Sequence, residues 1–322
     1  MPPHSQCAGS RERATVTIIC NLDAPGAGAT LIDALSTQGY AAVRGHGVPD
    51  EVVTDMRDAS LAFFDLPREE KARCEWIGTG VWRGWQPVFE GGERFADDSN
   101  VEWREWLEQN LCPSAGGPDN ALNNWPATSP TLRPAWEAYH AAMFGLASAL
   151  VGLLARELEF DPSVLPAWQD GQYSNLVANH YPAQLTAPRP GQVRVAPHTD
   201  HGGITVLHVD DAPGGLQVAF DRSGWHPALV PSGALVVQVG DLLERLSAGR
   251  LRATPHRVVN PPADAGEDGR RLSLVYFHHP DLDTTVGPAT DGPAPRPPIR
   301  ARDWIEQRQG RYQEDGISDL LS

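Results

Sequence analysis

The sequence predicts a mainly β protein, a double-stranded β-helix or jelly roll with flanking helices and a helical N-terminal portion. Two observations predict it. After about residue 172, short segments rich in β-branched residues alternate with Gly, Pro and Asp turns, and His198-Thr199-Asp200 and His256 lie among these segments. Short strands separated by turns every dozen residues or so are typical of sandwiches and barrels. The candidate strands are 205–207, 216–218, 234–237 and 274–276.

The N-terminal portion carries helical patterns interrupted by one short strand. Apolar residues within 31–35 have helical spacing, and Gly39 ends this helix. Residues 40–43 then predict a strand. Asp50 is predicted to cap a second helix, which stops near Pro67. This part of the chain is therefore predicted to be mainly helical.

The middle and the C-terminal end differ in texture. Gly, Asn and Pro occur among many Trp in residues 82–125, which predicts long loops with short strands. Pro134 lies at the start of a long amphipathic core helix. Residues 281–300 are rich in Pro and Asp and predict a loop, and 301–313 predict a helix over the barrel mouth. The apolar side of the long helix comprises Trp136, Tyr139, Met143, Leu146, Leu150, Leu153 and Leu154.

These patterns predict one integrated unit rather than separate domains. At 322 residues the chain is long enough for a large buried core. No internal repeat or low-complexity tract divides it. We expect a disordered tail at 1–13, a mixed helical portion at 14–170, the jelly-roll core at 171–281, and a C-terminal loop and helix at 282–322.

Composition restricts the partners and the compartment. The formal net charge of −15 argues against nucleic acid and acidic membranes, because phosphate groups would be repelled. The 4 cysteines show no CxxC or framework spacing, which is typical of reduced thiols in the cytosol. No signal segment opens the chain, and no apolar run approaches the roughly 20 residues of a membrane span. We therefore expect a cytoplasmic protein with a small-molecule partner.

A candidate metal site is formed by His198, Asp200 and His256. Two imidazoles and a carboxylate on neighbouring strands can occupy one face of an octahedral iron(II) and leave three positions open. The His-x-Asp pattern alone is weak, but Arg271 and Ser273 follow on the next apolar strand with the same parity. An arginine there can bind a carboxylate through two parallel hydrogen bonds. Together these residues indicate an iron-dependent oxygenase.

Further motifs extend this pattern over most of the chain. With these motifs, the sequence resembles the iron(II)/2-oxoglutarate-dependent dioxygenases of the isopenicillin N synthase-like family. The resemblance implies a cupin-like double-stranded β-helix. The matching stretches are 39–40, 45–48, 63–67, 179–182, 198–207, 215–218, 256–258, and the Arg-x-Ser at 271–273.

The resemblance also implies ligands and chemistry. The triad of His198, Asp200 and His256 would bind Fe(II), so these residues are the catalytic and metal-binding candidates. Arg271 and Ser273 would bind the distal carboxylate of 2-oxoglutarate. The implied reaction couples oxidative decarboxylation of 2-oxoglutarate by O2 to hydroxylation, desaturation or cyclisation of a small organic substrate. Specialised metabolism, such as antibiotic biosynthesis, is the expected setting.

An Asn-x-Tyr-Pro motif supplies two more candidates for cofactor binding, Asn179 and Tyr181. In many family members the corresponding residues contact 2-oxoglutarate. The chain departs from the family pattern at two places. His180, between these two residues, replaces a residue that is commonly aromatic. The interval from His256 to Arg271 is also longer than usual, and we interpret the excess at 261–270 as a longer hairpin loop.

Family members build the substrate wall from N-terminal loops, the barrel mouth and the C-terminal segment. The wall candidates in this chain are His201, Phe277, Trp82, Trp85, Phe89 and Trp304.

Two other functions fit parts of the pattern. An iron oxidase of the same fold, similar to isopenicillin N synthase, uses no 2-oxoglutarate, and its Arg-x-Ser pair can bind a carboxylate of the substrate. The Asn179 and Tyr181 pattern favours 2-oxoglutarate. A barrel that binds a metal without catalysis would not need open iron positions beside a carboxylate clamp, which argues against that alternative.

Overall fold

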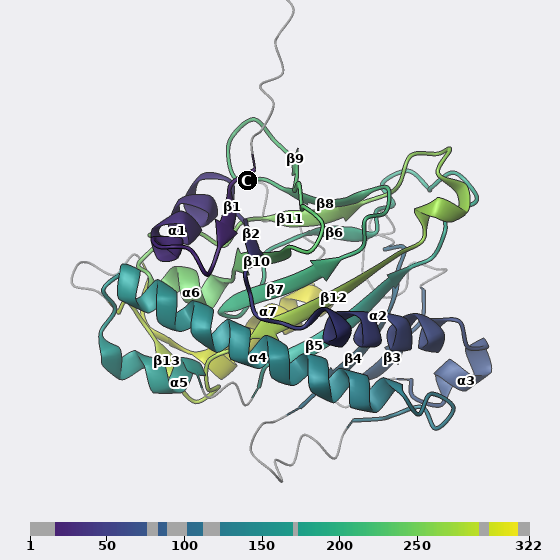
Figure 1. Ribbon diagram of the computed structural model, residues 1–322, viewed down its shortest axis with the longest axis horizontal. Helices are drawn as coiled ribbons and strands as arrows, with labels where there is room; N and C mark the ends of the chain where they lie inside the picture. Colours follow the sequence, from purple (N-terminus) through teal and green to yellow (C-terminus); the bar gives the residue numbers. More distant parts are fainter. Residues whose placement is uncertain are drawn as a thin grey trace, which may run out of the picture.

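The computed structural model describes residues 17–75, 83–88, 102–111, 123–169, 173–289 and 296–314 (Figure 1). The predicted tail at 1–13, Trp82 and Phe89 lie outside these residues. Two sheets form the core, a major sheet in the order β1-β2-β10-β7-β12-β5-β4-β3 and a minor sheet in the order β6-β11-β8-β9. The predicted jelly-roll fold with flanking helices is confirmed.

The strands of the major sheet are β1 (Ile19–Asn21), β2 (Ala41–Arg44), β3 (Gly84–Gln86), β4 (Glu105–Asn110), β5 (Asn175–Tyr181), β7 (Ile204–Val209), β10 (Leu235–Val239) and β12 (Arg271–His278). Those of the minor sheet are β6 (Val195–His198), β8 (Gly215–Val218), β9 (His226–Pro227) and β11 (His256–Val259). A separate pair consists of β13 (Thr285–Val286) and β14 (Ile299–Arg300).

Helices cover one side of the major sheet, as Figure 1 shows for α2 and α4. We call this side the outer face, and the side toward the minor sheet the inner face. Leu107, Leu176 and Leu274 on the outer face pack in one cluster with apolar residues of α4. The α-helices are α1 (Ala27–Thr37), α2 (Asp50–Phe64), α3 (Arg68–Ala72), α4 (Leu132–Glu157), α5 (Leu165–Gln169), α6 (Asp241–Leu246) and α7 (Ala301–Glu314).

One predicted element boundary needs correction. Asp50 is the first residue of α2 rather than its N-cap, which is Pro49, and its carboxylate lies in the first turn, where the helix dipole favours negative charge. The short strands predicted among the loops of 82–125 are observed as β3 and β4, which both belong to the major sheet. The sequence did not show which face of β4 is buried, because polar side chains stand on both faces.

Helix α4 corrects the expectation that no segment is apolar enough to span a membrane. It contains an 18-residue window with a mean hydropathy of 1.6, and 56% of that window is buried. Its inward side contacts α1, α2, β7 and β12. The apolar length of α4 is therefore explained by its place in the core, between the outer face of the sheet and the other helices.

Strand alternation assigns each side chain of β4, β5 and β12 to one of the two faces. Leu207 of β7 and Val218 of β8 belong to a second apolar cluster between the two sheets. Val275 of β12 lies opposite Leu207 and packs against the same cluster. Odd-numbered residues of β12 therefore point inward, together with the residues of β5 and β4 that lie opposite them.

Candidate metal centre and co-substrate clamp

The three predicted metal ligands meet between β6 and β11. His198 at the end of β6 lies directly opposite His256 at the start of β11. Asp200 Oδ1 is 3.8 Å from His198 Nε2 and 3.5 Å from His256 Nε2. One ligand atom from each residue lies within 4.8 Å of the other two. Among the described residues, this is the group of three or more such side chains that converges tightly enough to hold a metal ion.

Local backbone contacts orient both imidazoles. His198 Nδ1 is 2.9 Å from the carbonyl oxygen of Ala196, and His256 Nδ1 is 3.1 Å from that of Thr254. A carbonyl only accepts, so each Nδ1 carries the proton and donates it. Each Nε2 is left with a lone pair directed at the same point, which is the arrangement that metal-binding histidines require.

The electrostatics of the triad suit a divalent cation. Burial lowers the pKa of His198 to about 3, and the nearby His256 adds to the effect. Burial by itself raises the pKa of Asp200, but the two histidines and a 2.5 Å hydrogen bond from Thr205 Oγ1 outweigh it, and the pKa is lowered. At neutral pH the triad therefore contains a carboxylate and a neutral His198 imidazole, donors that fit iron(II).

The four residues of the predicted clamp also come together, on the inner face of β5 and β12. Arg271 lies opposite Tyr181, and Ser273 lies opposite Asn179. Tyr181 Oη and Ser273 Oγ are 3.3 Å apart. All four side chains are buried. We use the name clamp for these four residues.

A second buried arginine stands beside the clamp. Arg194 is 0% exposed, and its guanidinium carbon lies 5.4 Å from the centre of the Tyr181 ring. Burial lowers the pKa of Arg194 to about 10, and the charge of Arg271 contributes to the shift. Arg271 Nη1 donates to the carbonyl oxygens of Asp210 and Ala212 at 2.9 and 3.1 Å. Arg194 donates to the carbonyl oxygens of Pro213 and Gly269, so it adds positive charge beside the clamp while the Arg271 guanidinium is the group that can bind a carboxylate.

A cavity of about 830 Å³ lies beside Arg271 of the clamp. Arg271, Arg57, His208 and Gly215 line it, and residues of the triad do not. The cavity is therefore adjacent to the arginine of the clamp and separate from the candidate metal centre.

One clamp residue is already partly engaged. Arg104 Nη1 donates to Asn179 Oδ1 at 2.7 Å, and Arg104 Nη2 forms an ion pair with Glu102 at 2.8 Å. Since the Oδ1 atom of Asn179 accepts from Arg104, its Nδ2 is the group that can donate to a bound carboxylate. Arg104 was not predicted, because it precedes β4 in a segment without a recognisable motif.

The wall candidates separate into inner-face and outer-face residues. Phe277 lies on the inner face opposite Thr205, which is the residue that donates a hydrogen bond to Asp200. Trp85 faces outward, where its Nε1 donates to Glu105 Oε2 at 2.8 Å. Trp85 is thus separated from the inner face by the sheet itself, and its assignment to the substrate wall was wrong.

Helix α7 contacts the loop between His198 and Asp200 through Arg308, a residue that was not predicted. Arg308 Nη2 donates to Thr199 Oγ1 at 3.0 Å, and Arg308 Nε is 3.3 Å from Asp241 Oδ2. The predicted Trp304 lies one turn earlier, with the guanidinium carbons of Arg245 and Arg308 at 5.2 and 5.9 Å from its ring. Trp304 thus supports the arginine that contacts the loop between His198 and Asp200.

His201 lies beside the triad and is only partly buried. Burial lowers its pKa to about 4, and the charge of Arg308 adds to the shift. A neutral imidazole at this place can donate or accept one hydrogen bond at the barrel mouth.

A polar group on the inner face was also missed. Asn175 Nδ2 donates to Glu108 Oε1 at 2.7 Å, and His279 Nε2 lies 3.1 Å from Asn175 Oδ1. Burial raises the pKa of Glu108 to about 7. The Nδ1 atom of His279 is buried and has no hydrogen-bond partner in the described part of the chain. These residues follow no sequence motif, and only the register of β4, β5 and β12 brings them together.

Two family models match the chain. The 2OG-Fe(II) oxygenase superfamily matches residues 172–280, and the N-terminal region of non-haem dioxygenases in morphine synthesis matches residues 21–128. Among curated proteins, validamycin A dioxygenase of Streptomyces hygroscopicus subsp. limoneus is 33% identical over 270 residues, which cover 81% of this chain and 73% of that protein.

Solved structures show the same fold. A full-length Neurospora crassa protein in complex with alpha-KG superposes with a TM-score of 0.80 at 23% identity, over 94% of this chain and 98% of that one. The rice dioxygenase for auxin oxidation gives a TM-score of 0.73 at 27% identity, over 94% and 98% of the two chains.

Proposed function

The chain belongs to the 2OG-Fe(II) oxygenase superfamily and is a 2-oxoglutarate-dependent dioxygenase, and we propose that its triad holds the iron and its clamp holds the co-substrate. The convergence of the three ligand atoms within 4.8 Å carries the first assignment. The clamp assignment is supported by the buried Arg271 guanidinium beside the paired hydroxyls of Tyr181 and Ser273. The substrate is a small organic molecule of secondary metabolism.

The bound groups and the protein divide the work. Iron(II) and 2-oxoglutarate, when bound, supply the oxidising chemistry that couples decarboxylation by O2 to oxidation of a substrate C–H bond. Asp200 is held by Thr205, and both histidines are held by backbone carbonyls, so the ligand set is preorganised. Arg271 orients the co-substrate through its distal carboxylate, and the surrounding apolar cluster excludes water.

The geometry favours 2-oxoglutarate over an oxidase that needs none. The Arg271 guanidinium can bind one carboxylate in either case, so Asn179 and Tyr181 distinguish the two. In many family members the corresponding residues contact 2-oxoglutarate, and here they lie opposite Ser273 and Arg271. An enzyme that depends on 2-oxoglutarate is therefore favoured.

We also propose that the substrate carries polar groups. Phe277 offers an apolar surface beside the metal centre, and Asn175 lies opposite it on the same inner face, hydrogen-bonded to Glu108 and His279. A hydroxyl or amino group of the substrate can hydrogen-bond to Glu108 and to the unpartnered Nδ1 of His279. This set would select a polar substrate over a hydrocarbon.

An anaerobic titration tests the proposal. Iron(II)-loaded protein is titrated with 2-oxoglutarate while the visible metal-to-ligand charge-transfer band is followed. We expect a band for the wild type and for Arg57→Ala, and none for Arg271→Ala at the same concentration. Arg57 is a matched control, because it lines the same cavity without belonging to the clamp. If iron binds and no band forms in the wild type, Arg271 serves a substrate carboxylate instead.

A further inference from the structure

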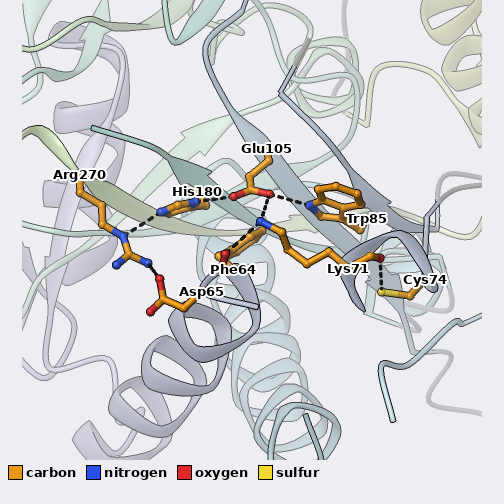
Figure 2. Close-up of polar contacts among 8 residues, drawn as sticks. All are labelled: Phe64, Asp65, Lys71, Cys74, Trp85, Glu105, His180 and Arg270. Atoms are coloured by element: carbon orange, nitrogen blue, oxygen red, sulfur yellow. Dashed lines mark hydrogen bonds and ion pairs between the residues drawn. The ribbon is translucent and has the colours of Figure 1, made fainter. Parts of the chain in front are cut away.

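Behind the clamp, on the outer face, lies a chain of buried polar contacts (Figure 2). Its centre is His180, the residue between Asn179 and Tyr181 of the clamp. His180 Nδ1 is 2.8 Å from Glu105 Oε1, and Arg270 Nε donates to His180 Nε2 at 2.9 Å. Because residues alternate along β5, the His180 ring points outward while its two neighbours point toward the co-substrate.

Glu105 is the hub of these contacts. It is 5% exposed, and besides His180 it accepts hydrogen bonds from Lys71 Nζ and Trp85 Nε1, each at 2.8 Å. Burial by itself raises the pKa of Glu105, but the hydrogen bonds from His180 and Lys71 and the charge of Lys71 outweigh it, so the pKa is lowered. A buried carboxylate with this many donors is held as an anion in one orientation.

Both ends of this series of polar contacts are bonded to residues at the C-terminal end of α2. Lys71 of α3 donates to the carbonyl oxygen of Phe64 at 3.0 Å, and at the other end Arg270 Nη2 donates to Asp65 Oδ1 at 2.7 Å. Phe64 and Asp65 are neighbours at the C-terminal end of α2. The contacts therefore form a closed ring from α2 through Lys71, Glu105 of β4, His180 of β5 and Arg270 back to α2 (Figure 2). We call Asp65, Lys71, Trp85, Glu105, His180 and Arg270 the Glu105 network.

The contacts also fix the tautomer and the plane of the His180 ring. A guanidinium has only donors, so Nε2 of His180 must accept from Arg270, and Nδ1 must carry the proton that is donated to Glu105. The ring of Phe64 stacks on the imidazole with a centroid distance of 4.9 Å and an interplanar angle of 19°. Hydrogen bonds at two ring edges and a stacked face leave His180 one orientation.

The network joins the two places where the sequence departs from the family pattern. One is His180 at a commonly aromatic position, and the other is the longer loop at 261–270, whose last residue is Arg270. Arg270 directly precedes Arg271 of the clamp, and Gly269 in the same loop accepts a hydrogen bond from Arg194. The longer loop therefore contacts His180 through Arg270, and Arg194 through Gly269.

We propose that the Glu105 network is a positioning device for co-substrate binding, in which His180, Glu105 and Arg270 set the orientation of the clamp residues next to them. The inference rests on the proposed role of the clamp. His180 fixes the segment of β5 that carries Asn179 and Tyr181. Arg270, held by His180 and Asp65, fixes the backbone directly before Arg271. The network acts through these neighbours and does not itself touch the co-substrate.

The test variant is His180→Phe, which keeps an aromatic ring against Phe64 and removes both ring hydrogen bonds. We expect the dissociation constant for 2-oxoglutarate, measured from the anaerobic charge-transfer band, to rise about tenfold. The affinity for iron(II), and kcat at saturating 2-oxoglutarate, should stay at the wild-type level, because the triad lies on the minor sheet. Arg270→Met, at a partly exposed side chain, should give a smaller rise of about threefold.

Gln109→Leu is the matched control. Gln109 is on the same strand and the same face as Glu105, is 0% exposed, and donates to the carbonyl oxygen of Asn124 at 2.7 Å. It lies opposite Leu176, at the end of β5 away from the clamp. This variant should lose stability without weakening 2-oxoglutarate binding. A loss of affinity equal to that of His180→Phe would overturn the proposal, because general loosening of the sheet would then explain both.

Lys71 gives a second readout, since it is the only lysine in the chain. Lysine labelled with 15N at Nζ should give one side-chain signal in the full-length protein, and this signal should be retained in His180→Phe and shifted in Glu105→Gln. Wild-type 2-oxoglutarate affinity in both His180→Phe and Arg270→Met would overturn the positioning role. Absence of the band in the wild type would instead overturn the clamp assignment, so the two failures are distinguishable.

Discussion

The triad and the clamp are supported in different ways. Each imidazole of the triad is held by a carbonyl two residues earlier in the chain, and Asp200 is held by the nearby Thr205. The clamp is supported from the outer face of the sheet by residues that are far apart in sequence, such as Glu105, which bonds to Lys71 and His180. The metal centre therefore depends on local chain geometry, and the clamp depends on the packing of two helices and three strands.

Because their supporting contacts differ, the triad and the clamp should be sensitive to substitutions in different parts of the chain. A change that loosens α2 or α3 can reach the clamp through the Glu105 network and leave the triad intact. A change within the loop after β6 alters the triad first. The two regions can therefore be perturbed separately. Three substitutions test whether they are as independent as their contacts indicate, and a fourth tests a buried group outside both.

The largest effect is expected for His256→Ala. The loss of one of three protein ligands should abolish measurable iron(II) binding and reduce turnover by at least about a thousandfold. Iron content after equilibrium dialysis and succinate release measure the two quantities. The Lys71 side-chain signal should remain unchanged, since the Glu105 network does not depend on the triad. Full activity with stoichiometric iron would contradict the ligand assignment.

A large effect on stability is expected for Lys71→Met. Its partner Glu105 would remain buried without its cation, which typically costs about 3–5 kcal/mol in the free energy of unfolding. Urea unfolding of the apo-protein measures this. In the double variant Lys71→Met/Glu105→Gln the buried charge is absent, so more than half of the loss should be recovered. Equal losses in the single and double variants would show that the ion pair is not the source.

Thr205→Val should act on the opposite region and by less. The side chains are similar in size, but valine cannot donate the hydrogen bond that orients Asp200. Iron(II) affinity should fall by about tenfold, with 2-oxoglutarate affinity of the iron-saturated protein unchanged. Thr205→Ser keeps the hydroxyl and should restore most of the affinity. If Thr205→Ser behaves like Thr205→Val, packing rather than the hydrogen bond holds the carboxylate.

The same difference between local and distant contacts explains what the sequence could predict. The residues of the triad and of the clamp could be predicted because His-x-Asp, Arg-x-Ser and Asn-x-Tyr-Pro are short motifs on individual strands. The Glu105 network was not found, because its members come from five separate segments and meet only when β4 pairs with β5. Arg194 was missed for the same reason, since it lies in no motif and becomes significant only beside Tyr181.

The wrong placement of Trp85 has a related physical cause. An aromatic residue in the N-terminal loops is a reasonable wall candidate, but strand parity decides which face it occupies. Trp85 lies on β3 opposite Leu107 of β4, and the parity of β4 was hidden because Glu105 and Glu108 place carboxyl groups on opposite faces. The charge of Glu105 is compensated by Lys71, which a single sequence does not reveal.

The smallest expected effect concerns Glu108, which belongs to neither region. Its pKa is raised to about 7, so the folded protein binds a proton there more tightly than the unfolded chain does. Stability from this group is therefore present at low pH and is lost as pH rises from about 4.5 through 7. Relative to the wild type, Glu108→Gln should gain on the order of 1 kcal/mol in unfolding free energy between pH 5 and 8. Urea unfolding at several pH values measures it. A pH-independent difference would mean that Arg83 and Asn175 already hold Glu108 as an anion.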